Sequence, residues 1–218
     1  MFEGPAGEIV SGRDAASVLD VACGNLRFAD YLRKRYPTCD FAYHAVDNCA
    51  PLVGDASAVA FHEVDIGGSL IADSFEDDLA VSPCDLVVCF GYLHHVPGKE
   101  LRACLLRALV QKVRPGGCLV VSFWQFLNSP ELAEKARVSH ARGLEALASS
   151  GLDSALLEEG DYLLGWQDAQ DAFRYCHSFT PEEICTLVQD AGLGDQVVDR
   201  FEADGRTGNL NGYLVLRP

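Results

Sequence analysis

The chain has 218 residues, 49% of them hydrophobic, and its 32 acidic and 17 basic residues give a formal net charge of −15. This length suits one domain with a subdomain inserted in it, and an acidic chain of this kind is poorly suited to non-specific nucleic-acid binding. No apolar run is long enough to cross a bilayer and no leader peptide is recognisable, so we expect no membrane partner.

Nine cysteines are spread along the chain without a CxxC pair. Several of them lie in apolar, strand-like runs, among them Cys84, Cys89 and Cys118. We interpret them as small buried hydrophobic residues of a protein in the reducing cytoplasm. Neither a disulfide framework nor a zinc site is expected from this pattern.

The first clear element is a strand predicted at 17–22, followed by a helix at 26–36 and joined to it by three small residues, Ala22, Cys23 and Gly24. Small residues let a ligand approach the backbone, and the first turn of a helix presents free N–H groups. This arrangement is typical of nucleotide-binding sites in open α/β sheets, although an ordinary corner between a strand and a helix has the same pattern.

Two further predicted strands end in carboxylates. The strand at 41–47 ends in Asp47, about 23 residues beyond Gly24, close to the offset at which a carboxylate accepts both hydroxyls of a ribose. The strand at 59–66 contains Asp65, which could accept from an adenine amino group. The alternative for Asp47 is a residue that caps its strand.

A fourth predicted strand, at 84–91, is almost wholly apolar and is followed by Tyr92, His94 and His95. The carboxyl end of a central parallel strand opens into the ligand crevice of such a sheet. Two adjacent histidines suggest a metal. Neighbours in a loop seldom converge, however, and no third ligand is close in the sequence, so we expect these residues to line a cofactor or substrate site and no metal to be bound.

The remaining pattern completes one domain, residues 1–218. Strands and helices alternate from 17 to 124, with a helix at 99–113, a turn at 114–117 and a strand at 118–124, which favours a parallel sheet with helices on both faces. Residues 1–16 predict a loose arm with a helical turn near Ile9. We interpret 125–178, with a helix at 129–149, as an inserted lid, and 197–216 as an antiparallel hairpin behind a helix capped by Thr180.

Taken in order, these motifs resemble the class I S-adenosylmethionine-dependent methyltransferases over about 17–216. The segment Asp20–Asn25 looks like the first motif of that family, and Asp47, Asp65 and the fourth strand look like the motifs that follow it. The resemblance implies an α/β fold with a doubly wound, mostly parallel seven-stranded sheet and a C-terminal antiparallel hairpin. It also implies a cytoplasmic enzyme, EC 2.1.1.-, that converts S-adenosylmethionine to S-adenosylhomocysteine. The cofactor-binding residues it implies are Asp20, Ala22, Cys23, Gly24, Asn25, Arg27, Asp47, Asn48, Asp65, Ile66, Cys89, Phe90 and Gly91.

The chain departs from the family pattern at Leu26, where the family commonly has glycine. A side chain there would narrow the cofactor cleft or shift the loop. This leaves open an S-adenosylmethionine-binding protein with weak or no activity. A nicotinamide-dependent dehydrogenase is a second alternative, which a parallel last strand in place of a hairpin would support.

The acceptor is expected to be a small molecule or tRNA with an O or N nucleophile. His94–His95 and the segment Arg174–Phe179 are similar to the tRNA wobble-uridine methyltransferases that esterify a carboxymethyl group, whereas the acidity of the chain and its short arm count against a large RNA. A carboxylate nucleophile needs no base; a hydroxyl or amine may need one. The catalytic candidates are His94, His95, His177 and Tyr92, and Trp124 and Tyr175 are candidates for lining the acceptor pocket.

Overall fold

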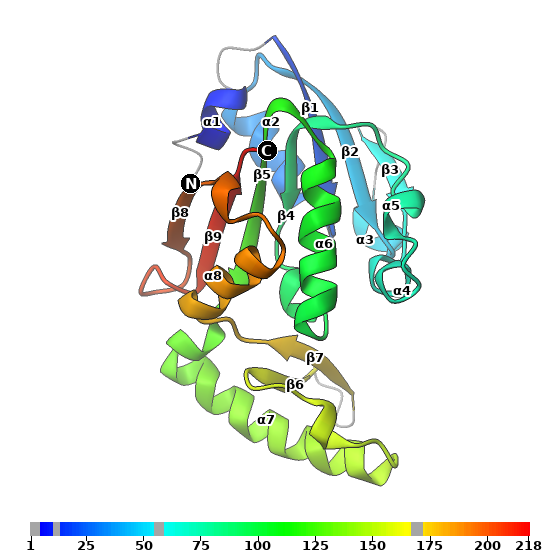
Figure 1. The fold of residues 1–218 in the computed structure, drawn as a ribbon, viewed down its shortest axis with the longest axis vertical. Helices are drawn as coiled ribbons and strands as arrows, with labels where there is room; N and C mark the ends of the chain where they lie inside the picture. The colour runs from blue at the N-terminus through cyan, green and yellow to red at the C-terminus, as the bar shows by residue number, and fades with distance from the viewer. Residues whose placement is uncertain (1–4, 11–13, 55–58, 167–171) are drawn as a thin grey trace.

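The computed structural model describes residues 5–10, 14–54, 59–166 and 172–218, and its centre is a seven-stranded sheet of order β3-β2-β1-β4-β5-β9-β8 (Figure 1). Neighbouring strands from β3 to β5 pair in parallel, whereas β9 is antiparallel to both β5 and β8. The expected fold class and its C-terminal hairpin are therefore confirmed. The strands are β1 (Ala15–Val21), β2 (Asp40–Asp47), β3 (Ala60–Glu63), β4 (Cys84–Cys89), β5 (Val113–Trp124), β8 (Val197–Ala203) and β9 (Asn211–Leu216).

Helices cover both faces of this sheet, and each face has its own apolar core. Successive residues of a strand point to opposite faces, so Leu19 belongs to one core and Val18 to the other. The first core receives apolar residues from α4 (Ile66–Ile71), α5 (Phe75–Asp78), α6 (Lys99–Gln111) and α8 (Pro181–Asp190). The second receives them from α1 (Pro5–Val10), α2 (Arg27–Arg35) and α3 (Ala50–Val53). Every residue of β4 is buried, as its apolar sequence predicts.

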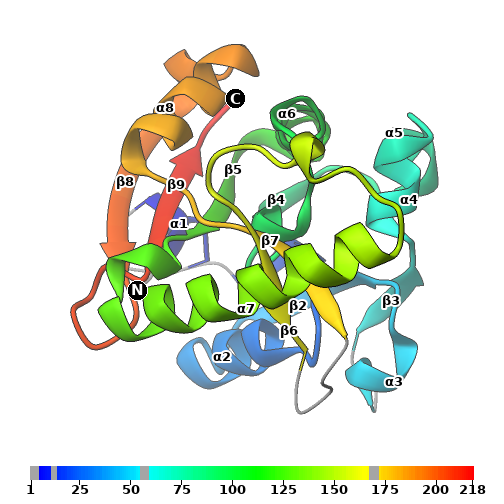
Figure 2. The same cartoon turned by 90° about the horizontal axis from the view of Figure 1, so that it is seen from below.

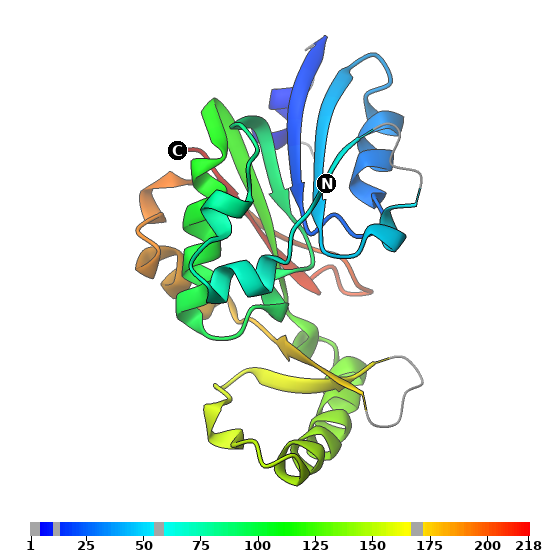
Figure 3. The same ribbon diagram turned by 90° about the vertical axis from the view of Figure 1, so that its right-hand side faces the viewer.

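A second, smaller unit lies between β5 and α8 in the chain. It consists of the long helix α7 (Pro130–Ser149) and a two-stranded antiparallel sheet of β6 (Asp161–Gly165) and β7 (Phe173–His177). We call this unit the insertion. Figures 1 and 3 show it beneath the end of β5, and in Figure 2, which views the molecule from below, it lies on the side that faces the viewer. The insertion thus lies at the carboxyl ends of the parallel strands, where the ligand crevice of such a sheet is found.

Two predicted boundaries were wrong. The segment 114–117, predicted as a turn, is part of β5. Val113 pairs with Cys84, and the Arg114 guanidinium bonds the Asp85 carboxylate at 2.9 Å. At the place of the expected turn, the pairing of β4 with β5 shifts in register between Cys84 and Leu86. The third strand ends at Glu63, because the Asp65 carboxylate accepts from the Gly68 N–H and caps α4. The β6–β7 sheet was not predicted. The predicted α7 and the capping box of Thr180 and Glu183 are present.

Candidate active site

The turn after β1 lines a cavity of about 460 Å³ at the carboxyl ends of β1 and β4. Gly24 and Gly91 both have positive φ there, and a Cβ atom at either position would meet no atom within 4 Å. The backbone at these two points is therefore open to a ligand, as the small-residue turn predicted. The lining residues are Asp20, Ala22, Cys23, Gly24, Asn25, Arg27, Phe28, Phe90, Gly91, Ser122, Asn211 and Tyr213.

Asp47 ties this turn to the end of β2. One carboxylate oxygen accepts from the Gly24 N–H at 2.9 Å, and the other accepts from the Cys49 N–H at 3.0 Å. The Cys23 N–H also donates to the Val46 carbonyl at 3.0 Å. Each carboxylate oxygen keeps a lone pair beyond these bonds, so the half-buried Asp47 remains able to accept hydroxyl groups.

Asp20 is a buried carboxyl on the wall of the cavity. Burial raises the pKa of Asp20, a hydrogen bond from the Tyr43 hydroxyl at 2.5 Å partly opposes this, and the charge of Asp47 adds to it. The resulting pKa is about 7. A cation placed beside Asp20 would stabilise the ionised form. The wall is therefore suited to the ammonium of an amino-acid moiety.

Of the two expected effects of Leu26, a narrower cleft or a shifted loop, the first is not observed, because its side chain is absent from the cavity lining. Its backbone is left-handed, with φ of 59°, and its side chain is buried in the core beneath α2 and does not line the cavity. A left-handed conformation costs a residue with a Cβ about 1–2 kcal/mol. Leu26 thus carries backbone strain that glycine would avoid, while its side chain contributes to the core.

Several predicted cofactor residues lie outside the lining of this cavity, Asp47 among them, although its carboxylate accepts a hydrogen bond from Gly24, which does line it. Cys89 and Ile66 are buried in the core, so their side chains do not face a ligand. Asn48 is exposed, and Asp65 is exposed at the start of α4. The Tyr92 hydroxyl would be 3.5 Å from a Cβ atom at Gly67, in the first turn of α4. Tyr92 therefore lies near Asp65 and Ile66, the residues predicted to bind the adenine.

The predicted histidines converge at the turn after β4, a 3-10 turn of Leu93–His95. Their ring centroids are 4.1 Å apart, and the His94 ring lies 5.0 Å from the Trp124 ring. Cys176 of β7 brings its Sγ to 3.7 Å from His95 Nδ1. The ligand atoms of His94, His95 and Cys176 all lie within 4.8 Å of one another, so the expectation that the pair would diverge and lack a third ligand was wrong.

The two imidazoles differ in their hydrogen bonds. His95 Nδ1 lies 3.0 Å from the Tyr175 carbonyl, which can only accept, so this nitrogen carries the proton and Nε2 keeps its lone pair in the neutral ring. His94 Nδ1 is buried with no partner in the described part of the chain. Burial, the neighbouring imidazole and the Arg174 charge lower the pKa of His94 well below its usual value. Burial and Arg174 also lower the pKa of His95, against the bond to Tyr175.

His177 and Tyr175 belong to a buried network and not to an open pocket. The two ring nitrogens of His177 lie 2.6 Å from Asp161 and 2.8 Å from Glu183. The Tyr175 hydroxyl donates to Asp161 at 2.5 Å and accepts from Arg102. Neither His177 nitrogen is free to take a proton from an acceptor, so the network holds the insertion against α6 and α8. The sequence predicted Glu183 only as part of the capping box, placed Arg102 off the leucine stripe of the helix at 99–113, and gave no signal for Asp161.

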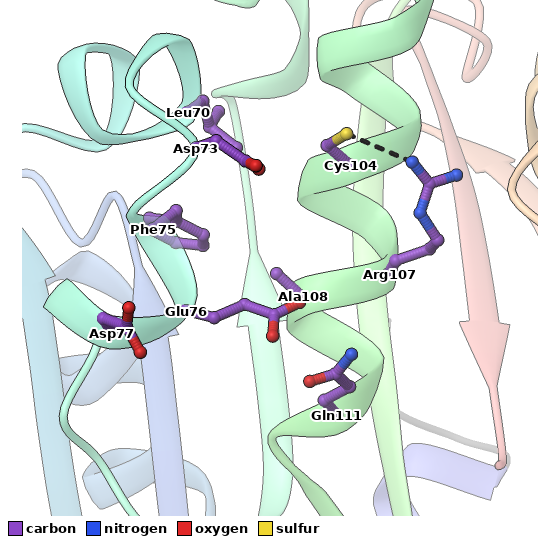
Figure 4. Close-up of a pocket in the computed structure, with 9 residues that line it drawn as sticks. All are labelled: Leu70, Asp73, Phe75, Glu76, Asp77, Cys104, Arg107, Ala108 and Gln111. Atoms are coloured by element: carbon purple, nitrogen blue, oxygen red, sulfur yellow. Dashed lines mark hydrogen bonds between the residues drawn. The ribbon is translucent and has the colours of Figure 1, made fainter.

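A second cavity, of about 400 Å³, lies between α5 and α6 and contains none of the predicted residues (Figure 4). Its walls carry the acidic Asp73, Glu76 and Asp77 on one side. On the other side Arg107 donates to Cys104 Sγ at 3.1 Å. The predicted cofactor-binding turn, in contrast, lines the first cavity.

A family model described as a methyltransferase domain matches residues 7–196. The chain belongs to the class I S-adenosylmethionine-dependent methyltransferases. An S-adenosylmethionine-dependent methyltransferase from Methanosarcina mazei has a TM-score of 0.61 and 17% identity, covering 94% of this chain and 95% of the other. The protein DhpI, in a complex with S-adenosylmethionine and HEP, gives 0.59 and 20%, covering 98% and 84%. The cofactor of this methyltransferase is S-adenosylmethionine, and the antiparallel β9 excludes the sheet expected of a dehydrogenase.

A further similarity, over part of the chain, concerns a tRNA enzyme. The methyltransferase is 25% identical over 121 residues to the tRNA (carboxymethyluridine(34)-5-O)-methyltransferase ALKBH8 of Macaca fascicularis. This match covers 55% of the present chain and 15% of that protein, so the chain spans a small part of its length. In the described part of the methyltransferase, no helix is long and apolar enough to cross a membrane.

Proposed function

We propose that this methyltransferase transfers a methyl group to a hydroxyl or amine of a small-molecule acceptor, with His95 as the general base. The observation that carries the proposal is the hydrogen bond from His95 Nδ1 to the Tyr175 carbonyl. It fixes the tautomer in which Nε2 can accept a proton, and the lowered pKa keeps the ring neutral at physiological pH.

The cavity residues suit S-adenosylmethionine. In this proposal the open backbone at Gly24 and Gly91 admits the cofactor, Asp47 accepts the ribose hydroxyls, and Asp20 faces the ammonium of the methionine moiety. Arg27, an exposed cation on the cavity wall, binds the methionine carboxylate. The bound cofactor supplies a methyl group already activated by the sulfonium, so the protein has mainly to orient the acceptor and exclude water.

The position of His95 relative to this cavity follows from the chain. Gly91 and Ser122 line the cavity, and the histidine turn follows Gly91 directly. Trp124, two residues beyond Ser122, packs on His94. We therefore propose that Trp124 and His94 form a wall of the acceptor pocket and that His95 Nε2 takes the proton of the nucleophile. The insertion covers this pocket as a lid.

The second candidate acceptor is the carboxymethyl group of a tRNA wobble uridine. The partial match to the tRNA enzyme and the Arg174–Phe179 segment favour it. The net charge of −15 disfavours a polyanionic substrate. A carboxylate nucleophile also needs no base, so His95 would have no proton to accept in that reaction.

The test is a methyl-transfer assay with purified protein, S-adenosylmethionine, a panel of hydroxylated and amino small molecules, and unfractionated tRNA. We expect transfer to a small molecule, and His95→Gln should lower kcat by about 100-fold without changing S-adenosylhomocysteine affinity. His62→Gln, in the His44–His62 pair between β2 and β3, is the matched control. Transfer to tRNA alone, or full activity of His95→Gln, would overturn the proposal.

A further inference from the structure

Arg174 of β7 is a cation without a counter-ion in the described part of the chain. Its Nε is buried and has no hydrogen-bond partner, and the described residues include no carboxylate within ion-pair distance of its guanidinium. The guanidinium carbon lies 4.9 Å from the centroid of the Trp166 ring. Aromatic stacking orients the guanidinium but leaves its N–H donors without an acceptor.

Arg102, which is fully buried, is paired much more completely than the half-buried Arg174. Arg102 is 2% exposed, donates its Nε to the Val96 carbonyl at 2.9 Å and bonds the Tyr175 hydroxyl. Its charge is balanced by Asp161 at 3.4 Å and Glu158 at 3.5 Å.

The place of Arg174 connects it with the histidine pair. Residues two apart on a strand share a face, so Arg174 lies on the face of β7 that carries Cys176, and Cys176 contacts His95. The charge of Arg174 lowers the pKa of both His94 and His95, which places the cation within electrostatic reach of the pair. Hence the Arg174 Nε and the His94 Nδ1, neither of which has a partner among the described residues, both lie in the neighbourhood of His95, and we take the space between them as the candidate site.

We propose that Arg174 binds an anionic group of the acceptor, such as a carboxylate, phosphonate or phosphate, next to the nucleophile that His95 deprotonates. This inference rests on the proposed function, because it assigns the anion to the methyl acceptor. The acceptor is then a small molecule with two functional parts, a hydroxyl or amine that receives the methyl group and an anion that fixes its orientation. Arg174 is a substrate-binding residue, and His95 remains the base.

An anion fits this space better than a metal ion does. The donor atoms of His94, His95 and Cys176 are close enough together for a cation, but Arg174 places a positive charge beside them. His95 Nδ1 is already bonded to the Tyr175 carbonyl, and burial raises the pKa of the Cys176 thiol to about 11, which disfavours the thiolate. A guanidinium, in contrast, presents donors suited to a carboxylate or phosphate.

The experiment compares matched compounds in calorimetric titrations of the protein saturated with S-adenosylhomocysteine. Aromatic and aliphatic hydroxy acids, in carboxylate, phosphonate and phosphate form, are each paired with the neutral amide or alcohol. In wild type we expect at least one acid to bind at least tenfold more tightly than its neutral counterpart. The acid that binds most tightly identifies the type of anion that the site prefers. Arg174→Gln should abolish this preference, Arg174→Lys should restore part of it, and Arg137→Gln, on the insertion but paired with Glu134, should retain it.

The outcomes separate this inference from the proposed function. Equal binding of every acid and its neutral counterpart, or an unchanged preference in Arg174→Gln, overturns the anion site. A preference that depends on Arg174, together with no methyl transfer to any of these compounds, contradicts the proposed function and leaves the anion site standing. Loss of methyl transfer on treatment with a chelator, restored by zinc, would assign the histidine pair to a metal and overturn the inference. Affinity for S-adenosylhomocysteine reports that each variant is folded.

Discussion

Two groups of polar side chains meet where the insertion joins the main sheet, and they differ in how completely they are paired. In the first group, His177, Asp161 and Arg102 are buried and each has its charge or ring nitrogens matched by a partner. In the second group, the buried His94 Nδ1 and Arg174 Nε have no partner in the described chain. Unpaired buried groups are costly, so a complete network indicates a structural role and an incomplete one indicates a site that a ligand completes.

The largest expected effect is on stability, from breaking the complete network. Arg102→Gln leaves Asp161 buried without its cation and should lower the free energy of unfolding by about 3–5 kcal/mol, measured by urea denaturation. Arg114→Gln is the matched control, because its ion pair with Asp85 is half exposed on the arginine side, and we expect a smaller loss. Equal losses in the two variants would contradict the structural role assigned to the network.

The network also predicts the direction of acid sensitivity. Burial raises the pKa of Asp161, but hydrogen bonds from His177, Tyr175 and the Glu158 N–H outweigh it and bring the pKa below its usual value. A carboxyl whose pKa is lowered by folding stabilises the protein above its unfolded pKa, near 3.9, and that stability is lost as the pH falls through the folded pKa. Unfolding measured between pH 6 and pH 3 should therefore show a smaller slope in Asp161→Asn than in wild type.

Leu26, in the turn after β1, is both strained in its backbone and buried in its side chain. Leu26→Gly removes the strain of about 1–2 kcal/mol but also removes a buried side chain, whose loss costs about 2–5 kcal/mol. We expect a net destabilisation of about 2 kcal/mol with S-adenosylhomocysteine affinity unchanged, because the side chain faces the core. Tighter cofactor binding in Leu26→Gly would show that this side chain does obstruct the cleft.

Asp20 gives a smaller effect, on cofactor affinity. If the ammonium of the ligand binds ionised Asp20, whose pKa is about 7, affinity for S-adenosylhomocysteine should rise about tenfold between pH 6 and pH 8. Calorimetry in buffers of different ionisation enthalpy should detect a proton released on binding near pH 7. Asp20→Asn should bind more weakly and lose this pH dependence; an unchanged profile would place the titrating group elsewhere.

The smallest effect is expected at the incomplete group. Arg174→Gln removes an unpaired cation, so the free energy of unfolding should change by less than about 0.5 kcal/mol. Its functional effect should appear in the pH profile of methyl transfer, because without the Arg174 charge the pKa of His95 rises and the acidic limb of kcat/KM moves to higher pH. A loss of stability as large as that of Arg102→Gln would erase the distinction between the two groups.

Local signals in the sequence were sufficient for most of the fold. Apolar runs located β1, β2 and β4, and the Thr180 capping box and the Ser129 cap located α8 and α7. The errors arose where tertiary contacts outweigh local preference. Arg114 and the residues after it extend β5 because Asp85 lies opposite, and Asp65 ends the third strand by capping α4.

The candidate site was predictable only in part, for a similar reason. The turn at Gly24, together with Asp47, could be read from one strand–turn–helix unit and its spacing to the next strand. The partners of His95 and His177 could not, since Tyr175 and Cys176 are about 80 residues from His95, and Asp161 belongs to a strand that the sequence did not predict. No sequence pattern could show that His94 Nδ1 and Arg174 Nε lack a partner among the described residues, because this depends on every element that packs around them.

The bond between Arg102 and Asp161 has a consequence for transplanting the insertion into another methyltransferase. Residues 125–178 form a continuous segment that enters after β5 and leaves before α8, which makes them convenient to exchange. Their buried carboxylate, however, takes its counter-ion from α6, outside the segment. A chimera that moves 125–178 alone would keep the bond between Asp161 and His177 but would lose the arginine that pairs with Asp161 in this chain. A functional graft must also carry an arginine at the site of Arg102 and a glutamate at that of Glu183.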